Sequence, residues 1–315
     1  MTSSPEEGHP VASHNGDFVG VTGEGGQACL WGRATPTPLS FTSTETCLAV
    51  FNDGRILTRS TRTGQLTCWD VPLISDPDPE EPPRLGRPDE RWVLELNTGR
   101  RARIVHTSIS PDERWVACLM TDRIFHIDMK ERRVRVSPVE EGSWKAATKS
   151  IAISRDGQQM AVAGLKGGEA WLYRPCPGKE QGLSRETIRK LEPETESRVT
   201  ACCFSQDGER LFLGDEDGRV RVLRLKGKRQ RSDESWMAQS FPITALAVSQ
   251  GGDLLAVAGG SSMTLWSTDH PPRLRIQLDT GPGARNWLQF CGQDTLLMHT
   301  APNRPIEVLE APESS

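Results

Sequence analysis

The chain has 315 residues, of which 38 are basic and 42 acidic, so that its formal net charge is −4. This balance does not favour the broad basic face that most nucleic-acid-binding proteins carry. No stretch of about 18 uninterrupted apolar residues occurs, and the first ten residues lack the basic flank and apolar run of a secretory signal. We therefore expect a soluble, cytoplasmic protein.

One pattern returns seven times along the chain: a polar turn, an apolar run, a second tight turn, and a short alternating run that closes on a large side chain. The copy from Val199 to Leu223 shows it most clearly. Because the period falls between about 20 and 50 residues and the units contain strand-like runs, the pattern predicts a ring or stack of small sheets. In chain order, the closing residues are Trp31, Trp69, Ile127, Tyr173, Leu223, Trp266 and Leu309.

Each unit contains two turns that suit hairpins. Asp-Gly, Asn-Gly and Gly-Gly pairs tolerate the positive φ that two-residue turns require, so between apolar runs they predict antiparallel strand pairs. The first turns are Asn15-Gly16, Asp53-Gly54, Asp112-Glu113, Asp156-Gly157, Asp207-Gly208, Gly251-Gly252 and Gly292-Gln293. The second turns are Gly25-Gly26, Thr63-Gly64, Thr121-Asp122, Gly167-Gly168, Asp217-Gly218, Gly260-Ser261 and Pro302-Asn303.

Strand-like runs fill the spaces between the turns. Val220 and Val222 alternate with charged neighbours, as in a half-buried strand, whereas the run from Leu254 to Ala258 is continuously apolar, as in a strand buried on both faces. A fourth strand is expected after the closing residue of a unit. Such fourth strands are predicted to begin at Pro38, Trp92, Arg133, Trp236 and Leu274.

Four antiparallel strands repeated seven times predict an all-β fold, a seven-bladed β-propeller. The length allows about 45 residues per blade, the usual size of a four-stranded blade. We expect one propeller domain over residues 11–310, preceded by a flexible N-terminus at residues 1–10 and followed by a flexible tail at residues 311–315.

The units resemble those of the WD-repeat β-propeller family, whose repeats carry Ser-x-Asp-Gly between two apolar strands and end on Trp-Asp. Ser154 to Gly157 and Ser205 to Gly208 match the first half, Ser110 to Glu113 matches it less closely, and Trp69-Asp70 is the one literal Trp-Asp pair. The resemblance covers about residues 11–310 and implies a role as an interaction scaffold. The compact Ser-x-Asp-Gly style is similar to that of bacterial members, which often belong to signalling or defence complexes.

Three insertions lengthen the link between the third and fourth strands of a unit, at about residues 73–91, 175–198 and 226–235. The first contains the charged, proline-rich run from Asp76 to Pro83, which predicts an extended, solvated loop. In the second, a Ser cap, an early Glu and later basic residues favour a short helix over residues 184–192. The third contains a compact basic run over residues 226–231.

All three insertions are expected on one face of the propeller, and insertions gathered on one face often mark the binding side of a repeat protein. The alternative is that long loops accumulate where they do no harm, and that a basic run without stacking aromatics is a solvated loop and no nucleic-acid site. The candidate partner-binding residues in the insertions are Arg185, Arg189, Lys190, Lys226, Lys228, Arg229 and Arg231.

The last unit lacks an obvious fourth strand. The residues after Leu309 are few and polar, and residues 1–10 carry two prolines and two glutamates, which suit a strand poorly. We therefore expect the last blade to be three-stranded or weakly closed. Ile306 and Val308 would then lie at an open edge, where a partner's strand can pair by β-augmentation.

The residue types that carry chemistry form no catalytic pattern. The eight cysteines include no Cys-x-x-Cys pair and most lie in predicted strands, so we expect buried free thiols and no metal site. His126 and Asp128 share a strand face without a third ligand. Asp215 and Asp217 crowd a hairpin tip, where Asp-Gly turn chemistry is the simpler explanation and a weak calcium site the alternative.

Two hypotheses about function follow. The first is a non-catalytic interaction scaffold or adaptor subunit, without cofactors, that binds protein or peptide partners, is monomeric alone and works within a hetero-complex. The second is a propeller enzyme or small-ligand binder with a funnel site assembled across blades. The innermost predicted strands, such as residues 243–248, offer mainly small and apolar side chains, which favours the scaffold.

Overall fold

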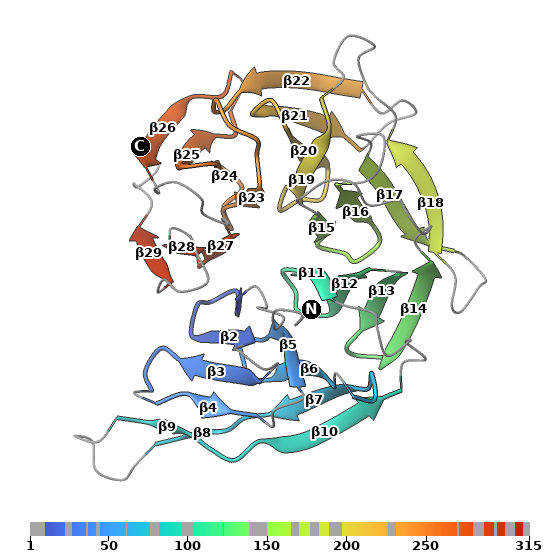
Figure 1. Ribbon diagram of the computed structural model, residues 1–315, viewed down its shortest axis with the longest axis vertical. Helices are drawn as coiled ribbons and strands as arrows, with labels where there is room; N and C mark the ends of the chain where they lie inside the picture. Colours follow the sequence, from blue (N-terminus) through green and yellow to red (C-terminus); the bar gives the residue numbers. More distant parts are fainter. Residues whose placement is uncertain are drawn as a thin grey trace, which may run out of the picture. The chain divides into compact units, whose positions relative to one another are not determined.

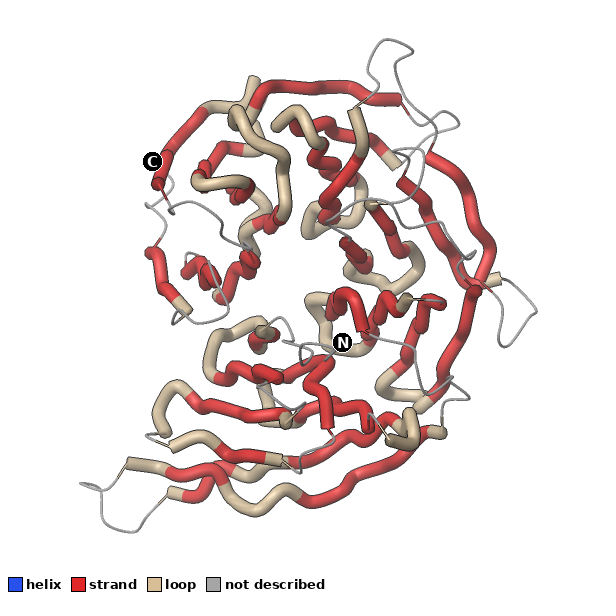
Figure 2. The backbone as a smooth tube through the Cα atoms, in the orientation of Figure 1, coloured by secondary structure: helices blue, strands red, loops and turns tan. Residues whose placement is uncertain are grey.

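The described residues of the computed structural model form strands, turns and loops, with no helix among them (Figure 2). The chain divides into two compact units, Met1–Ala102 and Arg103–Ser315. The structure describes residues 10–22, 27–35, 37–41, 45–60, 62–75, 82–95, 104–121, 123–138, 150–164, 170–176, 183–188, 197–225, 231–269, 271–279, 287–292, 295–299 and 306–310.

The first unit holds two antiparallel sheets and a short hairpin (Figure 1). Sheet 1 has the order β1-β2-β3-β4 and consists of β1 (Val11–Ala12), β2 (Phe18–Thr22), β3 (Ala28–Gly32) and β4 (Leu39–Ser40). Sheet 2 has the order β5-β6-β7-β10 and consists of β5 (Glu45–Val50), β6 (Ile56–Ser60), β7 (Leu66–Asp70) and β10 (Asp89–Leu94). The hairpin pairs β8 (Leu73–Ile74) with β9 (Arg84–Leu85).

The second unit holds five antiparallel sheets, each in the order of the chain. Sheet 3 consists of β11 (Ile104–Ile109), β12 (Trp115–Met120), β13 (Arg123–Asp128) and β14 (Arg133–Pro138). Sheet 4 consists of β15 (Ser150–Ile153), β16 (Met160–Ala163), β17 (Ala170–Pro175) and β18 (Leu183–Ile188). Sheet 5 consists of β19 (Val199–Phe204), β20 (Arg210–Asp215), β21 (Arg219–Arg224) and β22 (Arg231–Met237).

Sheet 6 consists of β23 (Ala245–Val248), β24 (Leu254–Gly259), β25 (Ser262–Ser267) and β26 (Leu274–Asp279). Sheet 7 has three strands among the described residues, β27 (Trp287–Cys291), β28 (Thr295–His299) and β29 (Glu307–Glu310). The predicted all-β class, the seven repeated sheets and the three-stranded last sheet are therefore confirmed.

The second insertion contains a strand where the sequence predicted a helix. Leu183–Ile188 forms β18, the fourth strand of sheet 4, which pairs along β17 with Arg185 opposite Tyr173. The helix predicted over residues 184–192 is therefore wrong for residues 184–188, and residues 189–192 lie outside the described part. A short capping pattern is worth little in free energy, and pairing with the open edge of β17 outweighs it.

The other two insertions also contain more strand than was expected. In the first insertion, β8 and β9 pair with each other, and Leu85 packs against the core between sheets 1 and 2. The extended loop was predicted for the run from Asp76 to Pro83, of which residues 76–81 lie outside the described residues. In the third insertion, β22 begins at Arg231, five residues before the predicted start at Trp236. Its polar sequence gives no strand signal, because pairing with β21 decides its conformation.

A buried serine hydroxyl organises the first turn of five sheets. In sheet 4, Ser154 accepts a hydrogen bond from the backbone N–H of Gln159 at 3.0 Å and donates one to Asp156 at 2.6 Å. The residue three positions after the serine has positive φ and donates its own N–H to the serine carbonyl. This network closes the hairpin and leaves no serine polar atom unpaired. The same serine position is occupied by Ser13, Ser110, Ser154, Ser205 and Ser249.

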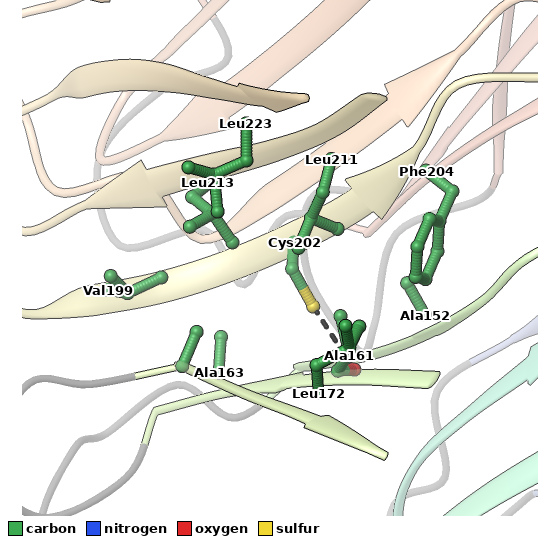
Figure 3. Close-up of a cluster of buried hydrophobic side chains, with 11 residues drawn as sticks. Ala152, Ala161, Ala163, Leu172, Val199, Cys202, Phe204, Leu211, Leu213 and Leu223 are labelled. Atoms are coloured by element: carbon green, nitrogen blue, oxygen red, sulfur yellow. Dashed lines mark hydrogen bonds between the residues drawn. The ribbon is translucent and has the colours of Figure 1, made fainter. Parts of the chain in front are cut away.

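Within each unit the core lies between successive sheets, and strand alternation decides which side chain faces which neighbour. Met160 and Val162 of β16 pack toward sheet 3, whereas Ala161 and Ala163 pack toward sheet 5. Sheet 5 fills the room left by these alanines with large side chains, as Figure 3 shows. The sulfur of Cys202 lies 3.5 Å from the carbonyl oxygen of Ala161 in the same interface. The large side chains of sheet 5 are Phe204, Leu211, Leu213 and Leu223.

The first turn of sheet 3 offers a test of the positive-φ position. Glu113 has φ of 58°, where the matching residue in sheets 4 and 5 is Gly157 or Gly208. A side chain with a Cβ in this region costs about 1 kcal/mol. We expect Glu113→Gly to exceed Glu113→Ala in free energy of unfolding by about 1 kcal/mol in urea titrations. Equal stability of the two variants would contradict the assignment, since both lack the glutamate side chain and differ only in the Cβ.

Candidate interaction surface

The structure places four of the nine predicted partner-binding residues. Arg185 lies in β18 and Arg231 in β22, on the outer strands of sheets 4 and 5, where their backbones pair with β17 and β21. Ile306 and Val308 lie together at the end of the chain, directly before and within β29. The others lie outside the described residues: Arg189, Lys190, Lys226, Lys228 and Arg229.

In sheets 2, 4 and 5, the enlarged link joins the third strand to the fourth at the same end of the sheet as the first turn. This follows from the antiparallel order of each sheet, in which the chain reverses at every strand. Within each of these sheets, the insertion and the first turn therefore share one end. The strands β18 and β22 belong to the sheets themselves, so only the linking residues remain to form a surface there.

The outermost strand of sheet 7 differs from its counterparts in the other sheets. β29 pairs with β28 along one edge, and no strand among the described residues flanks its other edge. It stands third in its sheet, a position that is flanked on both sides by strands in the six other sheets. The outward-facing N–H and C=O groups of such an edge are available for pairing with another strand.

Burial shows how unusual β29 is. The side chain of Val308, one position before the closing Leu309, is 64% exposed, while Leu309 packs partly against the core between sheets 6 and 7. The matching residue in the other sheets is between 0% and 5% exposed. In sheets 1, 4, 5 and 6 the matching side chain packs against the following sheet, so the exposure of Val308 describes one face of sheet 7 and not the edge of β29. The six matching residues are Leu30, Cys68, His126, Leu172, Val222 and Leu265.

Sequence reasoning identified Ile306 and Val308 but missed the two exposed carboxylates of β29, Glu307 and Glu310. Together they give a four-residue strand two negative charges and no positive one. The signal was present in the sequence, because Glu310 follows the closing Leu309 just as Asp70 follows the closing Trp69. Sequence reasoning also missed two exposed apolar residues, Met237 at the end of β22 and Phe241 after it, at 51% and 43% exposure.

The crowded carboxylates of sheet 5 are explained by turn chemistry. Asp215 is buried, and its Oδ2 atom accepts a hydrogen bond from Arg221 at 2.8 Å. Its Oδ1 atom accepts bonds from the backbone N–H groups of Asp217 and Arg219. Both oxygens are thus committed to the hairpin. No group of three or more potential metal-ligating side chains occurs among the described residues.

His126 and Asp128 serve separate structural contacts. The His126 ring stacks on Trp115 with centroids 4.7 Å apart, and its Nε2 atom lies 2.8 Å from the carbonyl oxygen of Gly157 in the next sheet. Burial lowers the pKa of His126 to about 4, with a further lowering from Arg135. Asp128 pairs with Arg114 at 3.0 Å. Although burial raises the pKa of Asp128, this pairing and backbone N–H bonds lower it overall.

All eight cysteines are free thiols, and five of them are buried, whereas Cys29, Cys176 and Cys203 are partly buried. Burial raises the pKa of Cys68, Cys202 and Cys291 to about 12, which keeps these thiols protonated at neutral pH. They fill apolar space and do not supply a thiolate nucleophile or metal ligand. No helix among the described residues is long and apolar enough to cross a membrane.

Comparison with known proteins agrees with this architecture. A family model for the WD domain, G-beta repeat, matches residues 185–223, from within β18 into β21. Type II inositol polyphosphate 5-phosphatase 15 of Arabidopsis thaliana is 29% identical over 119 residues, which cover 36% of this chain. The match spans only 11% of that curated relative, about a tenth of its length.

Two solved structures resemble the whole chain. A protein of unknown function from Desulfotomaculum acetoxidans superposes with a TM-score of 0.66 at 13% identity, over 93% of this chain and 92% of its own. The β-propeller domain of Cps50 (Swd1) from Myceliophteria thermophila superposes with a TM-score of 0.64 at 14% identity, over 99% of each chain. At these identities the likeness concerns the fold.

The open edge of sheet 7 is testable by amide hydrogen exchange. In β29 only the amides that point to β28 are bonded, so we expect the alternate, outward amides of Glu307–Glu310 to exchange rapidly. The third strand of sheet 6, β25, is flanked on both edges and serves as the control, with all of its amides slow. Uniformly slow exchange along β29 in the isolated protein would contradict an open edge.

His126 should make stability depend on pH. Its pKa in the folded protein lies near 4, below the ordinary 6.5, so the unfolded chain binds the proton more tightly between these values. The stabilisation is therefore complete above pH 6.5 and is lost as pH falls toward 4, by on the order of 2 to 3 kcal/mol. Urea unfolding of the wild type and His126→Gln at pH 7.5 and 4.5 measures this contribution. The wild type should lose more stability than the variant, and parallel losses would contradict the assignment.

Proposed function

The chain folds as a WD-repeat β-propeller, and from this premise we propose that it is a non-catalytic interaction scaffold, an adaptor subunit that binds protein or peptide partners. The observation that carries the proposal is the acidic third strand of sheet 7, which has no fourth strand beside it among the described residues, whereas the third strands of the six other sheets are flanked on both edges. Repeat folds commonly present extended surfaces and open edges to partners while the repeats themselves serve as a frame.

The chemistry of the described residues supports a scaffold over an enzyme. The buried thiols are held protonated, and the buried Asp215 is committed to a turn and an ion pair. The curated phosphatase relative matches over too little of its length to suggest that its activity extends to this chain. Free thiols at every cysteine favour a reducing compartment, so we place the scaffold in the cytoplasm.

Affinity capture from the native host tests the proposal. Tagged intact protein should retain one or a few proteins in near-stoichiometric amounts, resistant to moderate salt and to nuclease. The contribution of the insertions is measured with a variant in which residues 177–182 and 226–230 are replaced by Gly-Ser segments of equal length, leaving β18 and β22 intact. We expect this variant to retain less partner than the intact protein.

The matched control replaces residues 281–286, which link sheets 6 and 7 at the opposite end of the sheet from the first turns. This control should capture the partner at the wild-type level. Capture of no protein by the intact chain, or capture that nuclease abolishes, would sink the scaffold proposal. Equal capture by the insertion variant and the control would confine binding to surfaces other than these two insertions.

A further inference from the structure

The carboxylate that ends β29 has a counterpart whose partner is visible in the same chain. Asp70 follows the closing Trp69 at the end of β7, and Glu310 follows the closing Leu309 at the end of β29. Asp70 accepts two hydrogen bonds from Arg91, at 2.9 and 3.1 Å. Arg91 belongs to β10, the fourth strand of sheet 2. In that sheet, the fourth strand therefore brings the cation to the carboxylate.

Sheet 3 repeats this placement. Asp128 ends β13, and its register partner on the fourth strand β14 is Arg133. A second arginine of β14, Arg135, stands opposite His126, with its guanidinium 3.5 Å from the Nδ1 atom. In sheet 2 the residue directly opposite Asp70 is Asp89, and Arg91 reaches Asp70 from the bulge between Glu90 and Trp92. Both fourth strands thus place an arginine near the carboxylate that follows the closing position, although the ion pair of Asp128 is with Arg114.

The fourth strands also have a common pattern of apolar residues. In β14, Val134 and Val136 stand opposite Ile127 and Phe125 and alternate with arginines. In β26, Ile276 stands opposite Leu265 and packs against the core between sheets 6 and 7. Such a strand turns its apolar face partly toward a neighbouring sheet and its other face to water, as the partly buried Ile276 shows, which favours alternation with period two.

Sheet 7 has the third strand of this arrangement, β29, but no fourth strand beside it among the described residues. β29 presents an exposed apolar side chain, Val308, and a carboxylate, Glu310, at the position where Asp70 meets Arg91. Resting on the proposed scaffold function, we propose that β29 binds an extended peptide of a partner protein as the antiparallel fourth strand of sheet 7. In this peptide, apolar residues alternate with Arg or Lys, and one cation pairs with Glu310.

Two other occupants fit the edge less well. Residues 1–9 contain Glu6 and Glu7 but no Lys or Arg, and Pro5 lacks the N–H that a ladder needs. A second copy paired antiparallel through β29 would bring Glu307 and Glu310 of the two chains opposite one another, and like charges directly opposite are destabilising. Charge complementarity therefore favours a basic strand from a different protein.

Synthetic peptides test the proposal with purified protein. Fluorescein-labelled Arg-Val-Arg-Val-Arg-Val is titrated with the intact chain and followed by fluorescence anisotropy, beside Glu-Val-Glu-Val-Glu-Val and the proline-interrupted Arg-Val-Arg-Pro-Arg-Val. The basic peptide should bind, the acidic peptide should not, and the proline peptide should bind more weakly because it lacks one ladder donor. On binding, the outward amides of β29 should become slow to exchange.

A charge reversal at one residue distinguishes peptide pairing on β29 from nonspecific electrostatic attraction between the acidic protein and the basic peptide. Glu310→Lys should weaken the basic peptide by about fivefold or more and should bind the acidic peptide better than the wild type does. The control is Glu90→Lys, which makes the same charge change at an exposed position of β10. This control should bind the basic peptide as the wild type does. Equal weakening by the two variants would overturn the proposal.

The remaining outcomes are equally decisive. If the β29 amides are slow without peptide and become fast when residues 1–9 are deleted, the chain covers its own edge and the proposal fails. A wild-type dimer with slow β29 amides, which Glu310→Lys strengthens by placing a lysine opposite Glu307 of the other chain, would assign the edge to a second copy and would also overturn it. The scaffold function is judged separately by capture from the host. Stoichiometric partners together with no peptide binding would reject only the basic strand, while peptide binding without captured partners would reject the scaffold.

Discussion

Within each of the two units, the packing of successive sheets is the constraint on which the rest of the structure depends. A four-stranded sheet such as sheet 4 is apolar on both faces, with Met160 and Val162 on one and Ala161 and Ala163 on the other. It cannot bury both faces alone, so every unit requires neighbours. Protein interiors tolerate few voids. Large residues of β16 therefore fill the interface with sheet 3, while its alanines leave room for the large side chains of sheet 5.

Polar groups buried between the sheets fix how neighbouring sheets meet. His126 bonds the carbonyl of Gly157 across one interface, and Ser150 exchanges bonds with the backbone of Cys202 across the next. Trp115 lies so close to Gly157 that a Cβ there would fall 2.2 Å from its ring. Buried polar groups are costly unless paired, so these contacts permit one relative position of two sheets where apolar packing alone would permit several.

This constraint explains why the sequence predicts the repeats well and the insertions poorly. Turns such as Asp156-Gly157 are predictable from two adjacent residues, because positive φ favours glycine. The strand β24 is predictable from its continuous apolar run, because it is buried on both faces. The outer strands β18 and β22 are polar in sequence, and pairing with the open edge of the preceding strand decides their conformation. Glu310 was missed for a related reason. A single glutamate at the end of a strand indicates a cation partner only when the structure shows that Asp70, at the same position of sheet 2, binds Arg91.

The glutamates of the open edge have two effects: they oppose unwanted strand pairing, and they attract a basic partner. An exposed strand edge invites pairing with any other strand, and charged residues together with a short strand are the usual protection. β29 has both, with four residues of which two are glutamates. The same carboxylates repel acidic strands and a second β29, while they attract a cation placed as Arg91 is placed on Asp70. A hydrogen bond contributes only about 1 kcal/mol net, and four residues supply few of them. Such an edge therefore selects its partner by charge and holds it reversibly, which suits a scaffold whose components exchange.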